Sequence, residues 1–165
     1  MAVFVITSST LLAGTAFSTV APGDPGTQTV AGTITSATDL TAMLTSVDLS
    51  IDADEKDFTN LASNGWRIKR SGLKAGVLTL NFNQDFAASQ VDALLGLGGS
   101  LWPFAGSGTY YFDMKPTSSA RSATNPSYVG QVVPVSYKPV AGSVGDEAVI
   151  SIAYPCTGQI ARLTA

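Results

Sequence analysis

Residues 57–82 read DFTNLASNGWRIKRSGLKAGVLTLNF, and this stretch decides the expected fold. It holds a polar loop, a short basic segment, a turn between two glycines and a run with near-strict alternation. In that run Leu78, Leu80 and Phe82 share one face, which is typical of a half-buried strand. The same alternation occurs in residues 45–52 (TSVDLSID), so the sequence predicts a strand on either side of the loop.

The rest of the chain is also mostly β in pattern. Further strand-like runs are found at residues 109–115, 128–138, 147–154 and 159–164. One helix is expected at about residues 89–97, because Ser89 and Asp92 have the spacing of a capping box and glycines follow the apolar stripe. Many short strands separated by turn residues predict a β-sandwich or barrel.

Two segments carry more specific expectations. Residues 116–127 (PTSSARSATNPS) are polar and are expected to form a mobile loop. Residues 147–154 (EAVISIAY) are apolar on both faces, which predicts a central strand covered on both sides. The length of 165 residues suits a single domain over residues 1–165.

The composition favours a protein that associates with its own kind. Hydrophobic residues make up 45% of the chain and mean hydropathy is +0.24, whereas charged residues make up 13%, roughly half the usual share. Ser and Thr together supply 36 residues, so hydroxyl groups replace much of the usual surface charge. A lone monomer of this kind is poorly protected from association. A secreted β-domain is the alternative, but a subunit that covers its surface with copies of itself fits better.

Few side chains could support catalysis or bind a cofactor. The sequence has no His, which removes His-based acid–base chemistry and imidazole ligands for zinc. The only cysteine, Cys156, ends an apolar run and is expected to be a buried small hydrophobe. The acidic segment 52–57 lacks the glycine and the terminal Glu of an EF-hand. We therefore expect no enzyme, no cofactor and no metal site, although a carboxylate pair for glycoside hydrolysis stays open because it depends on the fold.

The N-terminal region is apolar enough to suggest a secretory signal, but it lacks the positive charge that normally opens one, so cleavage by a signal peptidase is the less favoured alternative. No Lys or Arg precedes Lys56, and polar residues interrupt every apolar run before a membrane-spanning length is reached. Residues 1–44 are expected to form an N-terminal arm and first strand, and residues 45–164 the β core. We expect a protein made in the cytoplasm, with no membrane partner.

Opposite charges cluster on the two sides of the loop. Five of the twelve acids are Asp48, Asp52, Asp54, Glu55 and Asp57, and four of the nine bases are Arg67, Lys69, Arg70 and Lys74. The clusters could offset each other locally, with about 0–1 kcal/mol for each exposed pair. They could instead provide complementarity between subunits. The overall charge of −3 argues against nucleic-acid binding through a broad basic face.

The order of these parts resembles that of major tail tube proteins of long-tailed (siphovirus-like) bacteriophages. The resemblance covers roughly residues 45–164 and depends on short motifs: Asp57-Phe58, Gly65-Trp66, Gly72-Leu-Lys-Ala-Gly76 before Val77–Phe82, Val91–Leu95, and Tyr128-Val-Gly130. It implies a β-sandwich or half-barrel with one flanking helix. It also implies hexameric rings that join their inner sheets into a β-barrel and stack into the virion tail tube through which double-stranded DNA passes.

The resemblance assigns roles to the charged residues. The long loop that typically reaches a neighbouring ring would be Asp52–Gly65, including Asp52, Asp54, Glu55, Asp57 and Phe58. Arg67, Lys69, Arg70 and Lys74 would form a subunit interface, and Asp48 and Asp52 would line an acidic lumen that repels DNA. Other tail proteins (tape measure, tail tip and terminator) would be partners, with assembly in the bacterial host cytoplasm.

Two other functions stay open from the sequence. A capsid decoration protein or another virion β-protein would share this composition but form trimers or monomers on a shell. A carbohydrate-binding module would need its aromatic residues on the surface as a sugar platform, namely Trp66, Trp102, Tyr110 and Tyr111.

Overall fold

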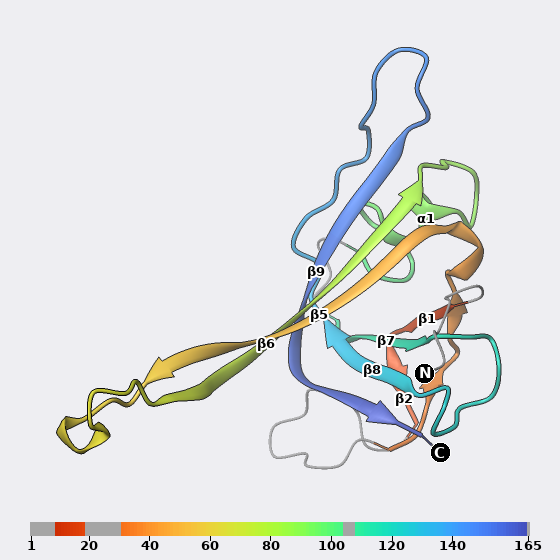
Figure 1. Ribbon diagram of the computed structural model, residues 1–165. Coiled ribbons are helices and arrows are strands. Elements are labelled where there is room, and N and C mark those ends of the chain that lie inside the picture. Colours follow the sequence, from red (N-terminus) through yellow and green to blue (C-terminus); the bar gives the residue numbers. More distant parts are fainter. Residues whose placement is uncertain (1–8, 19–30, 104–107, 165) are drawn as a thin grey trace.

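The computed structural model describes residues 9–18, 31–103 and 108–164. In chain order the elements are β1 (Thr10–Gly14), β2 (Ala16–Phe17), β3 (Ile34–Thr35), β4 (Thr38–Asp39), η1 (Thr41–Met43), β5 (Leu44–Asp57), η2 (Leu61–Ser63), β6 (Lys69–Asn83), α1 (Val91–Leu95), β7 (Tyr110–Lys115), β8 (Ser127–Val132) and β9 (Val149–Leu163). A seven-stranded antiparallel sheet and the small β2–β3 sheet account for the described strands (Figure 1). The predicted mostly-β fold is confirmed, and the described residues include one α-helix.

Strand β9 organises the large sheet, whose order is β4-β1-β7-β8-β9-β6-β5. Its first half, Val149 to Cys156, pairs with β6, whereas its second half, Cys156 to Leu163, pairs with β8 on its other side. Gly158 has a φ of 69°, a left-handed value that glycine adopts at little cost. The backbone therefore bends just after the pairing changes, and two groups of strands separate at this point (Figure 1).

A single large core connects the two groups of strands. The alternation of β6 places Leu78, Leu80 and Phe82 at 0% exposure, as the sequence predicts. The buried residues that pack in the same cluster include Ile150, Ile152 and Tyr154 of β9, Phe112 of β7, Val132 of β8 and Leu11 of β1. Both groups thus depend on one shared interior.

The other face of β9 is not covered in the described chain. Val149, Ser151 and Ala153 are exposed, while Ile150 and Ile152 are buried. The expected strand with two covered faces is therefore wrong for the isolated subunit. Association with another chain would cover this open face of small and apolar residues.

The helix is shorter than the expected span of residues 89–97. Helix α1 covers only Val91–Leu95, and its N-cap is Gln90, which makes no side-chain capping bond. Ser89 has a φ of 64°, so the predicted capping box is absent. Gly96 ends the helix, and a Cβ there would clash with the carbonyl oxygen of Asp92. Tight turns then lead the chain to Trp102, which is fully buried.

The polar segment 116–127 is held in place rather than loosely attached. Asn125 is buried, and its side-chain amide donates to the carbonyl oxygen of Ser119 at 2.9 Å. Arg121 forms an ion pair with Asp113 of β7 at 2.9 Å, and Ser127 donates to the same carboxylate. The loop is present where the sequence predicts it, and its buried polar groups have hydrogen-bonding partners within the subunit.

Part of the N-terminal region belongs to the sheet. Strand β1 lies between β4 and β7, and Leu11, Ala13 and Leu40 are buried in the core. Of the predicted N-terminal segment over residues 1–44, residues 1–8 and 19–30 lie outside the described part of the chain. Within the described ranges, no helix has the length and apolar character needed to cross a membrane.

Candidate assembly surfaces

The most prominent feature is a two-stranded arm that projects from the sheet. Strand β9 pairs with β6 only between Gly76 and Asn83, whereas β5 and β6 continue to pair as far as Asp57 and Lys69. We call residues 53–74 the arm; they extend away from the rest of the protein (Figure 1). Its side chains are exposed at all but two positions. Because no contacts within the subunit bury the arm, its charged and apolar side chains are available to a partner.

The predicted inter-ring loop is largely a strand. Asp52, Asp54, Glu55 and Asp57 all lie on β5, and of the five candidates only Phe58 follows the strand. The loop itself is residues 58–68. Asp57 lies opposite Lys69 and supports the strand there, whereas Lys56 and Arg70 lie opposite each other with like charge.

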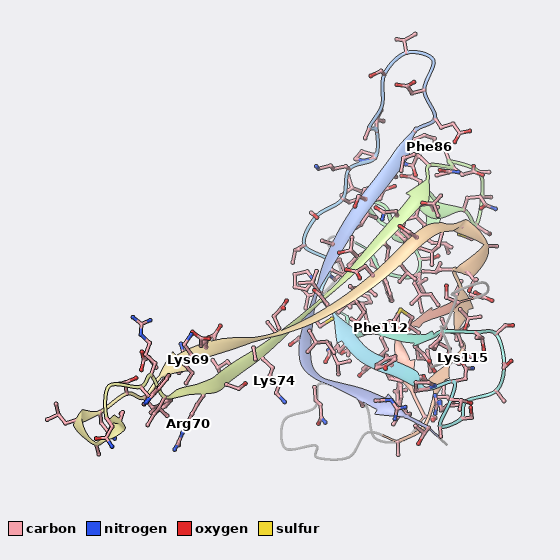
Figure 2. The ribbon with its side chains drawn as sticks, in the orientation of Figure 1. Lys69, Arg70, Lys74, Phe86, Phe112 and Lys115 are labelled. Atoms are coloured by element: carbon pink, nitrogen blue, oxygen red, sulfur yellow. The ribbon has the colours of Figure 1, made fainter. Side chains whose placement is uncertain are left out.

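The basic candidates lie on or next to the opposite strand of the arm. Lys69 Nζ lies 2.7 Å from Glu55 Oε1, and the Arg70 guanidinium lies 5.2 Å from the ring centroid of Phe58. Lys69 and Arg70 lie far along the arm and Lys74 closer to the body (Figure 2). Part of the charge is therefore offset within the hairpin. Arg67 has no hydrogen bond or ion pair to any residue in the described ranges.

The arm ends in a well-formed turn. Asn60 caps η2, accepting from the Ala62 N–H at 3.0 Å, and its own N–H donates to Ser63 Oγ at 2.9 Å. Asn64 and Gly65 follow with positive φ values of 48° and 81°, which reverse the chain. The turn is thus fixed by local hydrogen bonds rather than by burial.

We call this loop, residues 58–68, the arm tip, and its residues are unusually apolar for an exposed turn. Leu61 and Trp66 are 105% and 80% exposed, and Phe58 and Ile68 are also exposed. Asp57 stays ionised at the base of the tip, because hydrogen bonds from the Thr59 hydroxyl and N–H lower the pKa of its carboxyl group. Apolar side chains displayed on a fixed turn are typical of an interaction site.

A second surface is the outward face of the β5–β6–β9 strands. Asp48 pairs in register with Thr79, which pairs with Ala153, and Ser46 pairs with Asn81, which pairs with Ser151. Asp48 and Asp52 are both exposed on this face, on the side of β5 opposite the core. Segments 44–52, 75–83 and 149–155 contain no Lys or Arg. The face is therefore polar and weakly acidic.

A third surface is the outer edge of β5. Strand β5 is the last strand of the sheet and is 14 residues long, and no described strand pairs with its outer side. Such an edge leaves backbone N–H and C=O groups ready to pair with another chain. Monomeric proteins usually keep edge strands short, cover them or protect them with charges and bulges. Strand β5 is long and uncovered in the described subunit, and its charges and one of its register shifts lie mainly toward the arm.

A cavity of about 410 Å³ lies where the arm leaves the body. Ile51, Lys74, Cys156 and Ile160 are among its lining residues. Burial raises the pKa of the Cys156 thiol to about 11, so it is almost entirely protonated at neutral pH. Among the described residues, no group of three potential ligands could hold a metal ion.

We therefore expect Cys156 to react with iodoacetamide at pH 8 at least about ten-fold more slowly than free cysteine, because only the thiolate is nucleophilic. The rate should rise with pH as the thiol ionises toward its raised pKa. Mass spectrometry of timed samples measures this rate, and protein unfolded in urea provides the control. Native protein that reacts as fast as unfolded protein would contradict the assigned environment.

The aromatic residues do not form a sugar platform. Trp102, Tyr110 and Tyr111 are 0%, 4% and 7% exposed, and Trp102 packs edge-on against Tyr154 at a centroid distance of 5.2 Å. Of the four aromatic residues that a carbohydrate-binding module would use, only Trp66 is exposed. These four residues therefore do not form the platform that this function would require.

Chains with a similar fold are found among solved structures. A chain in the virion of a native gene transfer agent (GTA) particle matches with a TM-score of 0.53 and 19% identity, covering 73% of this chain and 85% of that one. The chain shares its fold with a GTA virion component. A chain from the tail of an empty GTA particle, solved with C6 symmetry, matches with a TM-score of 0.49 and 19% identity, covering 74% of this chain and 83% of that one. No protein-family model and no curated protein matches the sequence.

Proposed function

We propose that this protein is a structural, non-enzymatic subunit of a phage-like tail tube. The observation that carries the proposal is the long uncovered outer edge of β5, which is also one of the two strands that form the arm. Pairing of this edge with a neighbouring copy would extend the sheet and bury the exposed backbone groups. The fold shared with a virion component of a GTA particle supports this assignment.

In the proposed assembly, six copies form a ring and the β5–β6–β9 strands form its inner wall. The outward face with Asp48 and Asp52 would then line the lumen. DNA carries one negative charge per about 1.7 Å of helix axis, so a wall without Lys or Arg repels it weakly and binds it nowhere. Double-stranded DNA is thus a passing cargo rather than a ligand.

The arm provides contacts between rings in this proposal. Residues Asp52–Phe58 and the basic residues Arg67, Lys69, Arg70 and Lys74 would lie at the boundary between one subunit and the next. Tape measure, tail tip and terminator proteins would complete the tail at either end or inside it. The protein would be part of the virion tail, after assembly in the bacterial host cytoplasm.

Negative-stain electron microscopy of the concentrated, purified protein tests this function. The proposal predicts hollow tubes or six-fold rings that grow in number with protein concentration. Size-exclusion chromatography with light scattering at low concentration gives the mass of the starting species. Compact trimers, or monomers that persist at all concentrations, would overturn the proposal and favour a capsid decoration protein.

A further inference from the structure

The arm has a counterpart at the opposite end of the same strands. The segments that follow β6 and precede β9 meet there, above the sheet in Figure 1. Phe86 lies at this end, far from Lys69 and Arg70 (Figure 2). We define the end face by its exposed apolar and acidic residues: Asp85, Phe86, Leu97, Val140, Val144, Asp146, Glu147 and Val149.

Hydrogen bonds fix the end face within the subunit. The Gln84 N–H donates to the carbonyl oxygen of Ala148 at 2.7 Å, and its side-chain amide donates to Pro139 O at 2.8 Å. The Tyr137 hydroxyl donates to Asp92 Oδ1 of α1 at 2.7 Å. The loop before β9 is therefore joined to the segment around α1. A partner would meet a preformed surface and would not have to order it.

The end face exposes large apolar side chains. Phe86 is 62% exposed, Leu97 72%, Val140 79% and Val144 107%. The arm tip exposes Leu61 and Trp66 to a similar degree. Each surface alone would be an aggregation hazard, whereas contact between them would remove both from water.

The charges of the two surfaces are opposite. Residues 58–74 contain four bases, including Arg67, and no acid, although Glu55 of the facing strand pairs with Lys69. The end face has three exposed acids, Asp85, Asp146 and Glu147, and one base, Lys138, borders it. Charge complementarity of this kind sets register and suppresses wrong pairings.

We propose that the arm tip of one copy docks on the end face of a copy in the next ring. This inference rests on the proposed tail-tube function and adds the surface that receives the arm. Because the two surfaces lie at opposite ends of the same strands, the contact is heterologous and repeats along the strand direction. It therefore stacks rings without limit rather than closing them into a dimer of rings.

Charge reversal on each side tests the contact. The tip variant is Arg67→Glu, and the end-face variant combines Asp146→Lys with Glu147→Lys. Each should raise the protein concentration needed for tube growth by about ten-fold or more, since it places like charges in contact. A chain carrying all three substitutions should recover most of that loss. Arg162→Glu, at an exposed site of β9 outside both surfaces, is the control with the same charge change as the tip variant.

Light scattering gives the growth threshold, and tryptophan fluorescence follows the contact itself. Trp102 is already buried, so a shift of emission to shorter wavelength on tube growth reports burial of Trp66. Circular dichroism verifies that each variant is folded. If the wild type forms tubes and the tip and end-face variants form them at the same protein concentration, the docking is overturned. It is also overturned if the chain with all three substitutions needs as high a concentration as the worse of the two variants. Wild-type protein that forms neither rings nor tubes would instead overturn the proposed function.

Discussion

Replacing residues 53–74 by Asn-Gly is expected to abolish tubes while single rings persist. Asp52 and Ala75 lie opposite each other in the β5–β6 ladder, so a two-residue turn closes the shortened hairpin. The change removes the arm tip but keeps the edge of β5 from Leu44 to Asp52, which we propose joins neighbours within a ring. The loss should be complete, because every contact between rings in the account involves the arm.

Electron microscopy at concentrations that give wild-type tubes measures the effect. Thermal stability provides the control. The removed residues are exposed, and the core residues of β6 and β9 are unchanged. The melting temperature of the truncated chain should therefore stay close to that of the wild type. Full-length tubes from the truncated protein would show that the arm has no part in stacking.

Trp102→Ala is expected to lower the free energy of unfolding by about 3–5 kcal/mol. The side chain is fully buried, contacts the Tyr154 ring and lies with its Nε1 3.5 Å from the carbonyl oxygen of Gly14. It thus touches strands from both groups that separate at β9. A loss of this size is a large part of the stability of a typical domain.

Urea unfolding followed by far-ultraviolet circular dichroism measures this loss. Trp66→Ala is the matched control, because it removes the same side chain from a site that is 80% exposed. It should change the free energy of unfolding by no more than about 0.5 kcal/mol, while it weakens tube growth. Equal destabilisation by the two substitutions would contradict the assignment of one tryptophan to the core and the other to the surface.

The alternating strands could be predicted from the sequence, and the arm could be predicted only in part. Leu78, Leu80 and Phe82 report their burial through spacing alone. The acidic half of the arm has no such spacing, because neither of its faces is buried in the subunit. Its strand depends on pairing across the hairpin, such as Asp57 opposite Lys69, which a pattern of buried alternation does not encode.

The candidate surfaces could also be predicted from the sequence only in part. The charge clusters that flank the loop are visible in the sequence because they are contiguous. The end face is not, since Phe86 and Val144 are far apart in the chain and each reads as an ordinary loop residue. The open edge of β5 also depends on strand order, which only the three-dimensional structure provides.

Electron cryomicroscopy of assembled tubes, at a resolution that traces the backbone, tests the central claim most directly. The account predicts that the outer edge of β5 pairs with a strand of the neighbouring copy, and that Asp48, Thr79 and Ser151 face the lumen. A tube in which the edge of β5 faces solvent, or in which β7 and β8 line the channel, would contradict it.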